Sequence, residues 1–127
     1  MDLCFLAIGP TPSLEPSTVA VNFDQMKNRC NNIGAMLVKV TNKERQHYVQ
    51  LITAGALASH IAIQGTNTVD PNYNWTYDDG ISMEYLNWNE GEPNRDLWNI
   101  VMDSEYQYKW ITIGQFLQSS TVYICEK

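Results

Sequence analysis

Residues 85–94 read Tyr-Leu-Asn-Trp-Asn-Glu-Gly-Glu-Pro-Asn, and they form the most specific stretch of the chain. Glu92 offers a carboxylate and Asn94 an amide carbonyl, and Pro93 holds them two residues apart in a restricted turn. A cis peptide bond before this proline would point both oxygens in one direction. Converging oxygens suit calcium or the hydroxyl groups of a sugar. The stretch therefore predicts a loop that binds one of these two ligands.

The composition is typical of a folded domain that does not bind nucleic acid. The chain has 127 residues, of which 44% are hydrophobic and 17% charged, so we expect residues 1–127 to form a single domain. The net charge is −6 and the 8 basic residues are scattered, so no basic patch faces phosphates or an anionic membrane. No apolar run approaches the roughly 20 residues of a membrane span. We expect neither nucleic-acid binding nor membrane insertion.

Apolar spacing predicts two helices after an extended N-terminal arm over residues 1–18. Asn22 is expected to cap the first helix and Gly34 to end it. A capping box, Thr41-x-x-Glu44, is expected to start the second helix. The apolar stripe of this second helix is predicted at the following residues: Tyr48, Leu51 and Ile52.

The remaining pattern predicts short strands around a long ordered loop. The loop covers residues 66–96, which are rich in Asn, Asp, Gly and Pro and carry aromatic anchors. The predicted strands are Leu37–Val40, His60–Gly65, Ile100–Met102, Lys109–Ile113 and Thr121–Cys125. Two helices with short strands predict an α+β domain.

Four motifs, in order, resemble the C-type lectin-like domain family, and secreted invertebrate members in particular. The motifs are a cysteine-bearing helix that ends in Gly (N-R-C-N-N-I-G), W-T-Y-D-D-G at 75–80, the 85–94 stretch, and Y-I-C-E at 123–126. The resemblance covers the chain from about Val19. It implies two helices that flank short antiparallel sheets, a long ordered loop region, and a secreted, extracellular protein.

The resemblance also assigns the cysteines. It implies an intrachain disulfide between Cys30 and Cys125. The second bridge of the family would fall on Asn99 and Gln115, so both of its cysteines are absent together. Cys4 has no family partner, and we expect an interchain disulfide that gives a dimer, with a free thiol as the alternative. Separately, Asn74-Trp75-Thr76 is an N-glycosylation sequence.

Calcium in the sugar-binding members is held by the Glu and Asn of E-P-N, by a Glu a few residues later, and by a W-N-D triplet. Here Glu92 and Asn94 keep the first pair. The third ligand falls on Leu97, with Asp96 as an imperfect substitute, and the triplet becomes Trp110-Ile111-Thr112. Calcium prefers six to eight oxygens. We therefore expect no calcium at this site and no other cofactor, and Glu92, Asn94 and Asp96 stay as the candidates for a residual metal site.

The resemblance thus implies a calcium-independent carbohydrate-binding lectin. An N-acetylated hexosamine such as GlcNAc or GalNAc suits direct contact, because its acetamido group supplies a donor, an acceptor and a methyl group. The residues expected to contact the sugar are Glu92, Asn94, Arg95, Asp96, Trp98 and Lys109.

Two alternatives remain: a lectin-like domain that binds a protein partner and no sugar, and a calcium-dependent mannose-type lectin. The sequence has no G-x-S-x-G motif and no nucleophile placed beside a base, so we expect no enzyme.

Overall fold

A five-stranded sheet organises the computed structural model, which describes residues 15–16, 22–56, 58–67, 74–115 and 121–126. The strands lie in the order β1-β8-β3-β6-β7, in which only β3 and β8 run parallel. Their bounds are β1 Glu15–Pro16, β8 Thr121–Tyr123, β3 His60–Ile63, β6 Asn99–Asp103 and β7 Lys109–Ile113. Two small sheets accompany it, β2 (Met36–Leu37) with β9 (Cys125–Glu126) and β4 (Thr66–Asn67) with β5 (Trp75–Thr76). The predicted α+β class is confirmed.

Helix α3 (Phe23–Asn32) begins and ends where the sequence predicts. The side chain of Asn22 accepts a hydrogen bond from the Gln25 amide at 2.8 Å, which satisfies one of the free N–H groups of the first turn. Gly34 follows the helix with a φ of 74°, a conformation that glycine adopts without strain.

Helix α4 (Lys43–Thr53) differs from its prediction in its cap and in its buried face. The cap is Asn42 rather than Thr41, because the Asn42 side chain accepts from the Arg45 amide at 2.8 Å. Tyr48 and Leu51 are 40% and 70% exposed. The buried residues are Gln46, Val49 and Thr53, while Ile52 packs partly against the core. The predicted apolar stripe was therefore wrong at Tyr48 and Leu51. The helix instead turns Gln46 inward, because Trp110 and the Tyr108 carbonyl form hydrogen bonds with its side chain. A short 3-10 turn, η1 (Ala54–Ala56), follows the helix.

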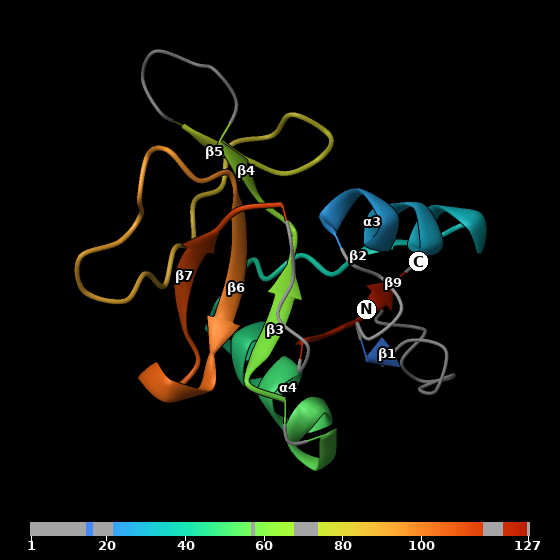
Figure 1. Cartoon of the computed structure of the whole chain (residues 1–127), viewed down its shortest axis with the longest axis horizontal. Coiled ribbons are helices and arrows are strands. Elements are labelled where there is room, and N and C mark those ends of the chain that lie inside the picture. Colours follow the sequence, from blue (N-terminus) through green and yellow to red (C-terminus); the bar gives the residue numbers. More distant parts are fainter. Residues whose placement is uncertain (1–14, 17–21, 57, 68–73, 116–120, 127) are drawn as a thin grey trace.

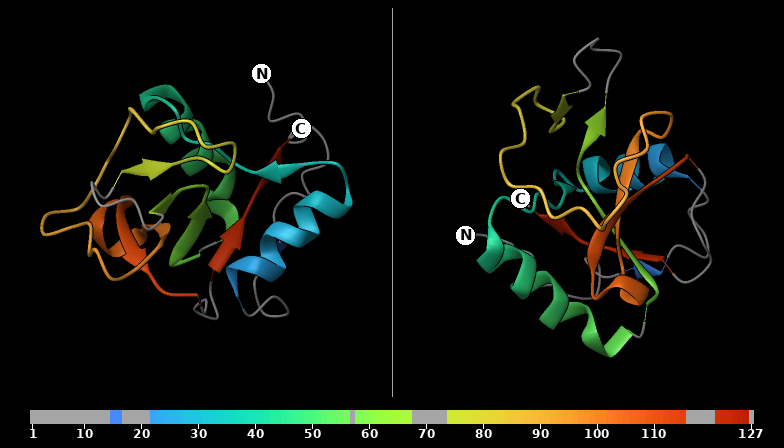
Figure 2. Two further views of the ribbon diagram at one scale, coloured as in Figure 1. Left: turned by 90° about the horizontal axis from the view of Figure 1, so that it is seen from above. Right: turned by 90° about the vertical axis from the view of Figure 1, so that its left-hand side faces the viewer.

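The two faces of the sheet bury two separate groups of side chains, because successive strand residues point to opposite faces. One group joins α4 and the aromatic loops and contains Ile61, Ile63, Ile100, Met102 and Trp110. The other group lies under α3 and contains Phe23, Met26, Ala62, Val101 and Tyr123. In Figure 1 and the right panel of Figure 2 the yellow loop region lies at the upper end of the sheet and α4 at the lower end.

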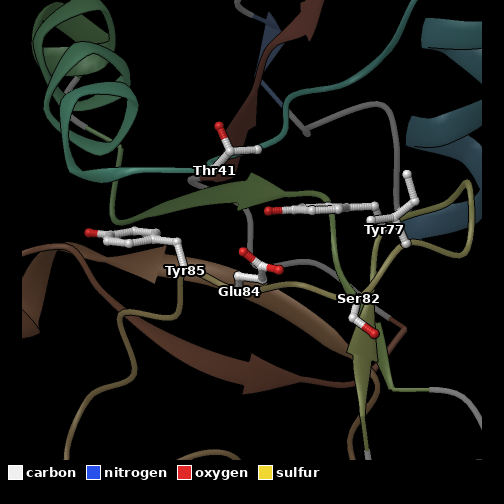
Figure 3. A pocket seen from close by; sticks show the side chains of 6 residues that line it. Thr41, Tyr77, Ser82, Glu84 and Tyr85 are labelled. Carbon is white, nitrogen blue, oxygen red and sulfur yellow. The ribbon is translucent and has the colours of Figure 1, made fainter.

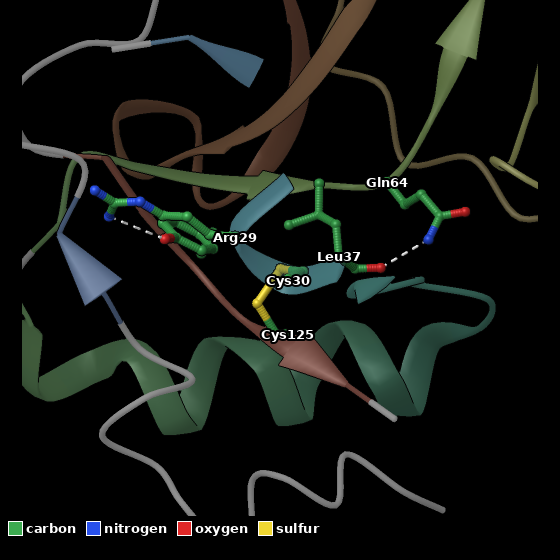
Figure 4. The surroundings of a disulfide bond; sticks show 6 residues. Arg29, Cys30, Leu37, Gln64 and Cys125 are labelled. Carbon is green, nitrogen blue, oxygen red and sulfur yellow. Dashed lines mark hydrogen bonds between the residues drawn. A yellow bond between two sulfur atoms is a disulfide. The ribbon is translucent and has the colours of Figure 1, made fainter. Parts of the chain in front are cut away.

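The predicted disulfide is present and joins α3 to β9 (Figure 4). Cys30 and Cys125 are separated by 95 residues, so their bond removes about 4–5 kcal/mol of chain entropy from the unfolded state in a loop-closure model. Cys4 lies outside the described residues. Of the predicted N-terminal arm, the structure describes only β1.

Polar contacts occupy the positions where the family has its second bridge. The Asn99 amide group donates to the Gly114 carbonyl at 3.3 Å. Gln115 accepts from the Phe23 amide through both its backbone and its side-chain oxygen, each at 3.0 Å. Gln115 thereby ties the start of α3 to the segment that follows β7.

Among the described residues no helix has both the length and the apolar character that crossing a bilayer requires.

Candidate functional site

The E-P-N loop is fastened to β7 by one threonine. The Thr112 hydroxyl donates to Glu92 Oε1 at 2.5 Å, and the Thr112 amide donates to the same oxygen at 2.9 Å. The Asn94 amide donates to Thr112 Oγ1 at 3.0 Å. The Glu92–Pro93 peptide bond is cis. Thr112 is 5% exposed, so it joins both polar residues of the loop from a buried position.

The loop also satisfies its own polar groups. Asn94 Oδ1 accepts from the Asp96 amide at 2.9 Å, which closes a turn around the side chain of Asn94. The Glu92 amide donates to the Asn89 carbonyl at 3.0 Å, and the Leu97 amide donates to the Asn94 carbonyl at 3.1 Å. One carboxylate oxygen of Glu92, Oε1, and the side-chain oxygen of Asn94 therefore both accept protein hydrogen bonds.

Three of the predicted sugar-contacting residues gather on the surface beside this fastened loop. Arg95 and Asp96 are exposed, and Trp98 is 60% exposed. Trp98 directly precedes β6, whose first residue pairs with Ile113, the neighbour of Thr112. The structure thus places a charged loop and a solvent-facing indole at the same end of the sheet.

Lys109 is not brought to this surface. It is the first residue of β7 and pairs with Asp103, whereas Thr112 pairs with Ile100 near the other end of the two strands. Three residues of extended chain separate Lys109 from Thr112 by roughly 10 Å. Lys109 and Thr112 are close in sequence, but the extended strand carries them toward opposite ends of β7.

Three tryptophans in edge-to-face contact anchor the preceding part of the loop to the core. Trp88 packs edge-on against Trp75 at 5.1 Å and against Trp110 at 5.8 Å between ring centroids. The Asn89 amide donates to the Trp110 carbonyl at 2.9 Å, so backbone bonds join the same segments. Trp110 and Trp75 are buried and Trp88 is half-buried, which confirms the expected core role of these rings.

The buried end of Trp110 depends on a residue that the sequence pattern missed. Trp110 Nε1 donates to Gln46 Oε1 at 2.9 Å, and Gln46 Nε2 donates to the Tyr108 carbonyl at 3.0 Å. Gln46 therefore joins α4 to Trp110 in β7 and to Tyr108, the residue before that strand. The sequence offered one signal of this role, namely that Gln46 lies at helical spacing from Val49 and Thr53, which are also buried.

Two acidic residues between β5 and the E-P-N loop are already paired. Asp78 lies 3.1 Å from Lys27 Nζ, and Asp79 lies 2.9 Å from Lys39 Nζ. A hydrogen bond from the Ile81 amide has the largest effect on the Asp79 carboxyl, and one from Lys39 has the next largest. Both hold the pKa of this carboxyl below its ordinary value.

Asn74, the predicted glycosylation residue, is exposed beside buried Trp75, and its glycosylation stays a prediction.

Comparison with known proteins gives one family and many similar folds. A family model described as the lectin C-type domain matches residues 19–127. No curated protein sequence matches the chain. A calcium-independent type II antifreeze protein is similar in structure, with a TM-score of 0.72, 23% identity, and coverage of 90% of this chain and 82% of that one.

Two further similar structures are lectins. SPL-1, solved as a GlcNAc complex, has a TM-score of 0.74 and 19% identity over 91% of this chain and 83% of its own. SPL-2 from Saxidomus purpuratus, described as a Ca2+-independent C-type lectin, has a TM-score of 0.72 and 17% identity over 84% of this chain and 79% of its own. At these identities the likeness concerns the fold.

Proposed function

The chain belongs to the C-type lectin domain family, and from that premise we propose that it binds carbohydrate directly, without calcium, at the E-P-N loop. The similar structures include both lectins and an antifreeze protein, so the fold alone does not select a ligand. The proposal rests on the chemistry of the loop.

One observation carries the calcium-independent part, namely the two hydrogen bonds from Thr112 to Glu92 Oε1. A cation bound at this oxygen would face the N–H and O–H groups that donate to it. Asn94 Oδ1 is likewise engaged by the Asp96 amide. Ile111 stands where a metal-binding member has an amide oxygen. This donor set does not fit calcium, which prefers six to eight oxygens.

Thr112 holds the two polar residues of the loop in place through its own hydrogen bonds. Its hydroxyl accepts from the Asn94 amide and donates to Glu92, so one side chain fixes the spacing of the loop. We assign Glu92 and Thr112 to positioning. Ligand contact falls to the exposed groups Asn94, Arg95, Asp96 and Trp98.

These exposed groups suit a sugar. The indole of Trp98 offers a flat apolar face for the C–H side of a pyranose, and the neighbouring charged and amide groups offer hydrogen bonds to its hydroxyls. An N-acetylated hexosamine is the first ligand to test, because its acetamido group adds a methyl, a donor and an acceptor. The GlcNAc bound to SPL-1 points to the same choice.

Family and fold are of a lectin-like, non-enzymatic kind, and the proposed activity is binding alone. An extracellular location is part of the proposal, since the Cys30–Cys125 bond persists in oxidising compartments.

A dimer linked through Cys4 would present two sugar sites and gain avidity. Electrophoresis with and without reductant tests this dimer, and a monomer band in both lanes rules out the interchain bond.

A glycan array run once with calcium and once with a chelator tests the proposed function. Binding that persists in chelator supports it. Binding that chelator abolishes would establish the calcium-dependent alternative. Absence of binding in both runs would favour a protein partner as the ligand.

A further inference from the structure

A pocket away from the E-P-N loop combines two tyrosines with an unpaired carboxylate. It has a volume of about 270 Å³ and lies between the segment that follows β5 and the residue before the N-cap of α4. The residues that line it are Thr41, Tyr77, Ile81, Ser82, Glu84 and Tyr85. In Figure 3 the carboxylate of Glu84 lies between the ring of Tyr85 and the hydroxyl end of Tyr77.

The walls of this pocket are fixed before any ligand binds. The Tyr77 amide donates to the Ile81 carbonyl at 2.9 Å, which closes the turn between two lining residues. Tyr77 is 7% exposed, and the Tyr85 ring packs edge-on against Trp110 at 5.8 Å. Rigid walls reduce the entropy that a ligand loses on binding.

The charge of the pocket is negative. Glu84 is exposed, and within the described residues it makes no hydrogen bond or ion pair. Glu44 acts electrostatically on Tyr85 and adds a second negative charge nearby. Two cations lie near Tyr77, and each pairs with a carboxylate: Arg45 with Glu126 and Lys39 with Asp79. The net charge of −6 also favours a cationic ligand over an anion.

The same tyrosine already binds a cation within the chain. Lys39 Nζ lies 5.1 Å from the centroid of the Tyr77 ring and 2.9 Å from Asp79. Lys39 does not line the pocket, whereas Tyr77 does. One ammonium group is thus held by a tyrosine face and a carboxylate, and the pocket repeats these elements with Tyr85 and Glu84.

We propose that this pocket is a second binding site, which takes a small organic cation with a substituted ammonium group. Tyr77 and Tyr85 would contact the alkyl groups through their rings, and Glu84 would balance the charge. Aromatic side chains around an ammonium group contribute about 0.5–2 kcal/mol each, depending on desolvation. The volume suits such a head group and is below the roughly 300–1,000 Å³ of sites for drug-sized ligands. This site is independent of sugar binding at the E-P-N loop.

An NMR titration of the whole chain with choline, compared with its neutral isostere 3,3-dimethylbutan-1-ol, tests the proposal. We expect choline to shift the amide signals of residues 81–85 and to bind about tenfold more tightly than the alcohol. Glu84→Gln should weaken choline binding by a similar factor, whereas Glu90→Gln, at another exposed acidic residue, should leave it unchanged. Equal binding of both probes, unchanged binding in Glu84→Gln, or no saturable shift with choline would overturn the proposal.

A third variant separates this site from the proposed lectin site. Trp98→Ala removes the exposed indole beside the E-P-N loop and should leave choline binding as in the wild type. Loss of choline binding in this variant would place the cation at the E-P-N surface and overturn the second site. Loss of sugar binding alone would leave it standing.

Discussion

The hydroxyl of Thr112 donates a hydrogen bond to the carboxylate of Glu92 across 2.5 Å, so strand β7 holds the E-P-N loop directly. The same hydroxyl accepts from the Asn94 amide at 3.0 Å. A residue that replaces a metal ligand in the family motif therefore joins both ends of the loop.

Replacing Thr112 with valine should lower the free energy of unfolding by about 1–3 kcal/mol, because a half-buried carboxylate loses a donor and the Asn94 amide loses its acceptor. Thr112→Ser keeps the hydroxyl and should cost about 1 kcal/mol or less for the lost methyl group. Urea unfolding measures both variants. Equal destabilisation by valine and serine would show that the hydroxyl does not hold the loop.

Trp98→Ala should weaken glycan binding by about 3- to 10-fold, the equivalent of roughly 0.5–1.5 kcal/mol for one aromatic contact. Its thermal unfolding should change little, because Trp98 is 60% exposed. Tyr106→Ala is the matched control, since Tyr106 is 43% exposed and lies at the opposite end of the β6–β7 pair. A Trp98→Ala variant that binds glycan as well as the wild type would remove the indole from the proposed site.

Gln46→Leu should destabilise the fold by about 1–3 kcal/mol, because the buried Trp110 N–H loses its acceptor. Leu51→Ala should change the free energy of unfolding by less than about 0.5 kcal/mol, since Leu51 is 70% exposed. Chemical denaturation compares the two variants. A larger loss in Leu51→Ala would restore the apolar stripe predicted from sequence and contradict the packing of α4.

Alkaline pH should destabilise the protein partly through Tyr77. Burial raises the pKa of the Tyr77 hydroxyl above 10.0, with Arg45 opposing and Asp79 and Glu84 adding to the rise. The folded chain then keeps a proton that the unfolded chain loses, so this contribution to stability is complete below pH 10 and declines as pH rises through the folded pKa.

Tyr77→Phe should therefore lose less stability than the wild type between pH 7 and about pH 11, measured by urea unfolding at both values. Tyr48→Phe is the control, because Tyr48 is 40% exposed on α4. Identical losses in the wild type and Tyr77→Phe would contradict the effect of burial on this hydroxyl.

Local features of the sequence were sufficient for much of the fold. The Asn22 cap, the positive-φ Gly34 and the strands β6 and β7 depend on neighbouring residues, and each agrees with its prediction. The last predicted strand, residues 121–125, is instead divided between β8 and β9, which lie in different sheets. The Cys30–Cys125 bond followed from motifs whose order is specific to one family. Motif order thus supplied the long-range pairing that composition could not.

Contacts between distant segments account for what the sequence did not predict. Gln46 is buried because Trp110 and the Tyr108 carbonyl, more than sixty residues away, use its side chain. Lys109 follows the loop in sequence, but the β6–β7 register places it at the other end of the strands. Predicting either feature would require knowledge of how β7 pairs with β6.

The candidate site shows the same division. The E-P-N residues were identified from sequence alone, whereas Thr112 was identified there only as a poor calcium ligand. Its role as a hydrogen-bond donor to Glu92 requires the loop to lie over β7. The tyrosine pocket was likewise missed, because it forms where the segment after β5 meets the start of α4.

Titration calorimetry with the tightest glycan from the array, in calcium buffer and again in chelator, tests the central claim most directly. Because Thr112 rather than a metal holds the loop, the two dissociation constants should agree within about twofold, or roughly 0.4 kcal/mol. Loss of binding in chelator that added calcium restores would contradict direct, calcium-independent recognition of sugar by this domain.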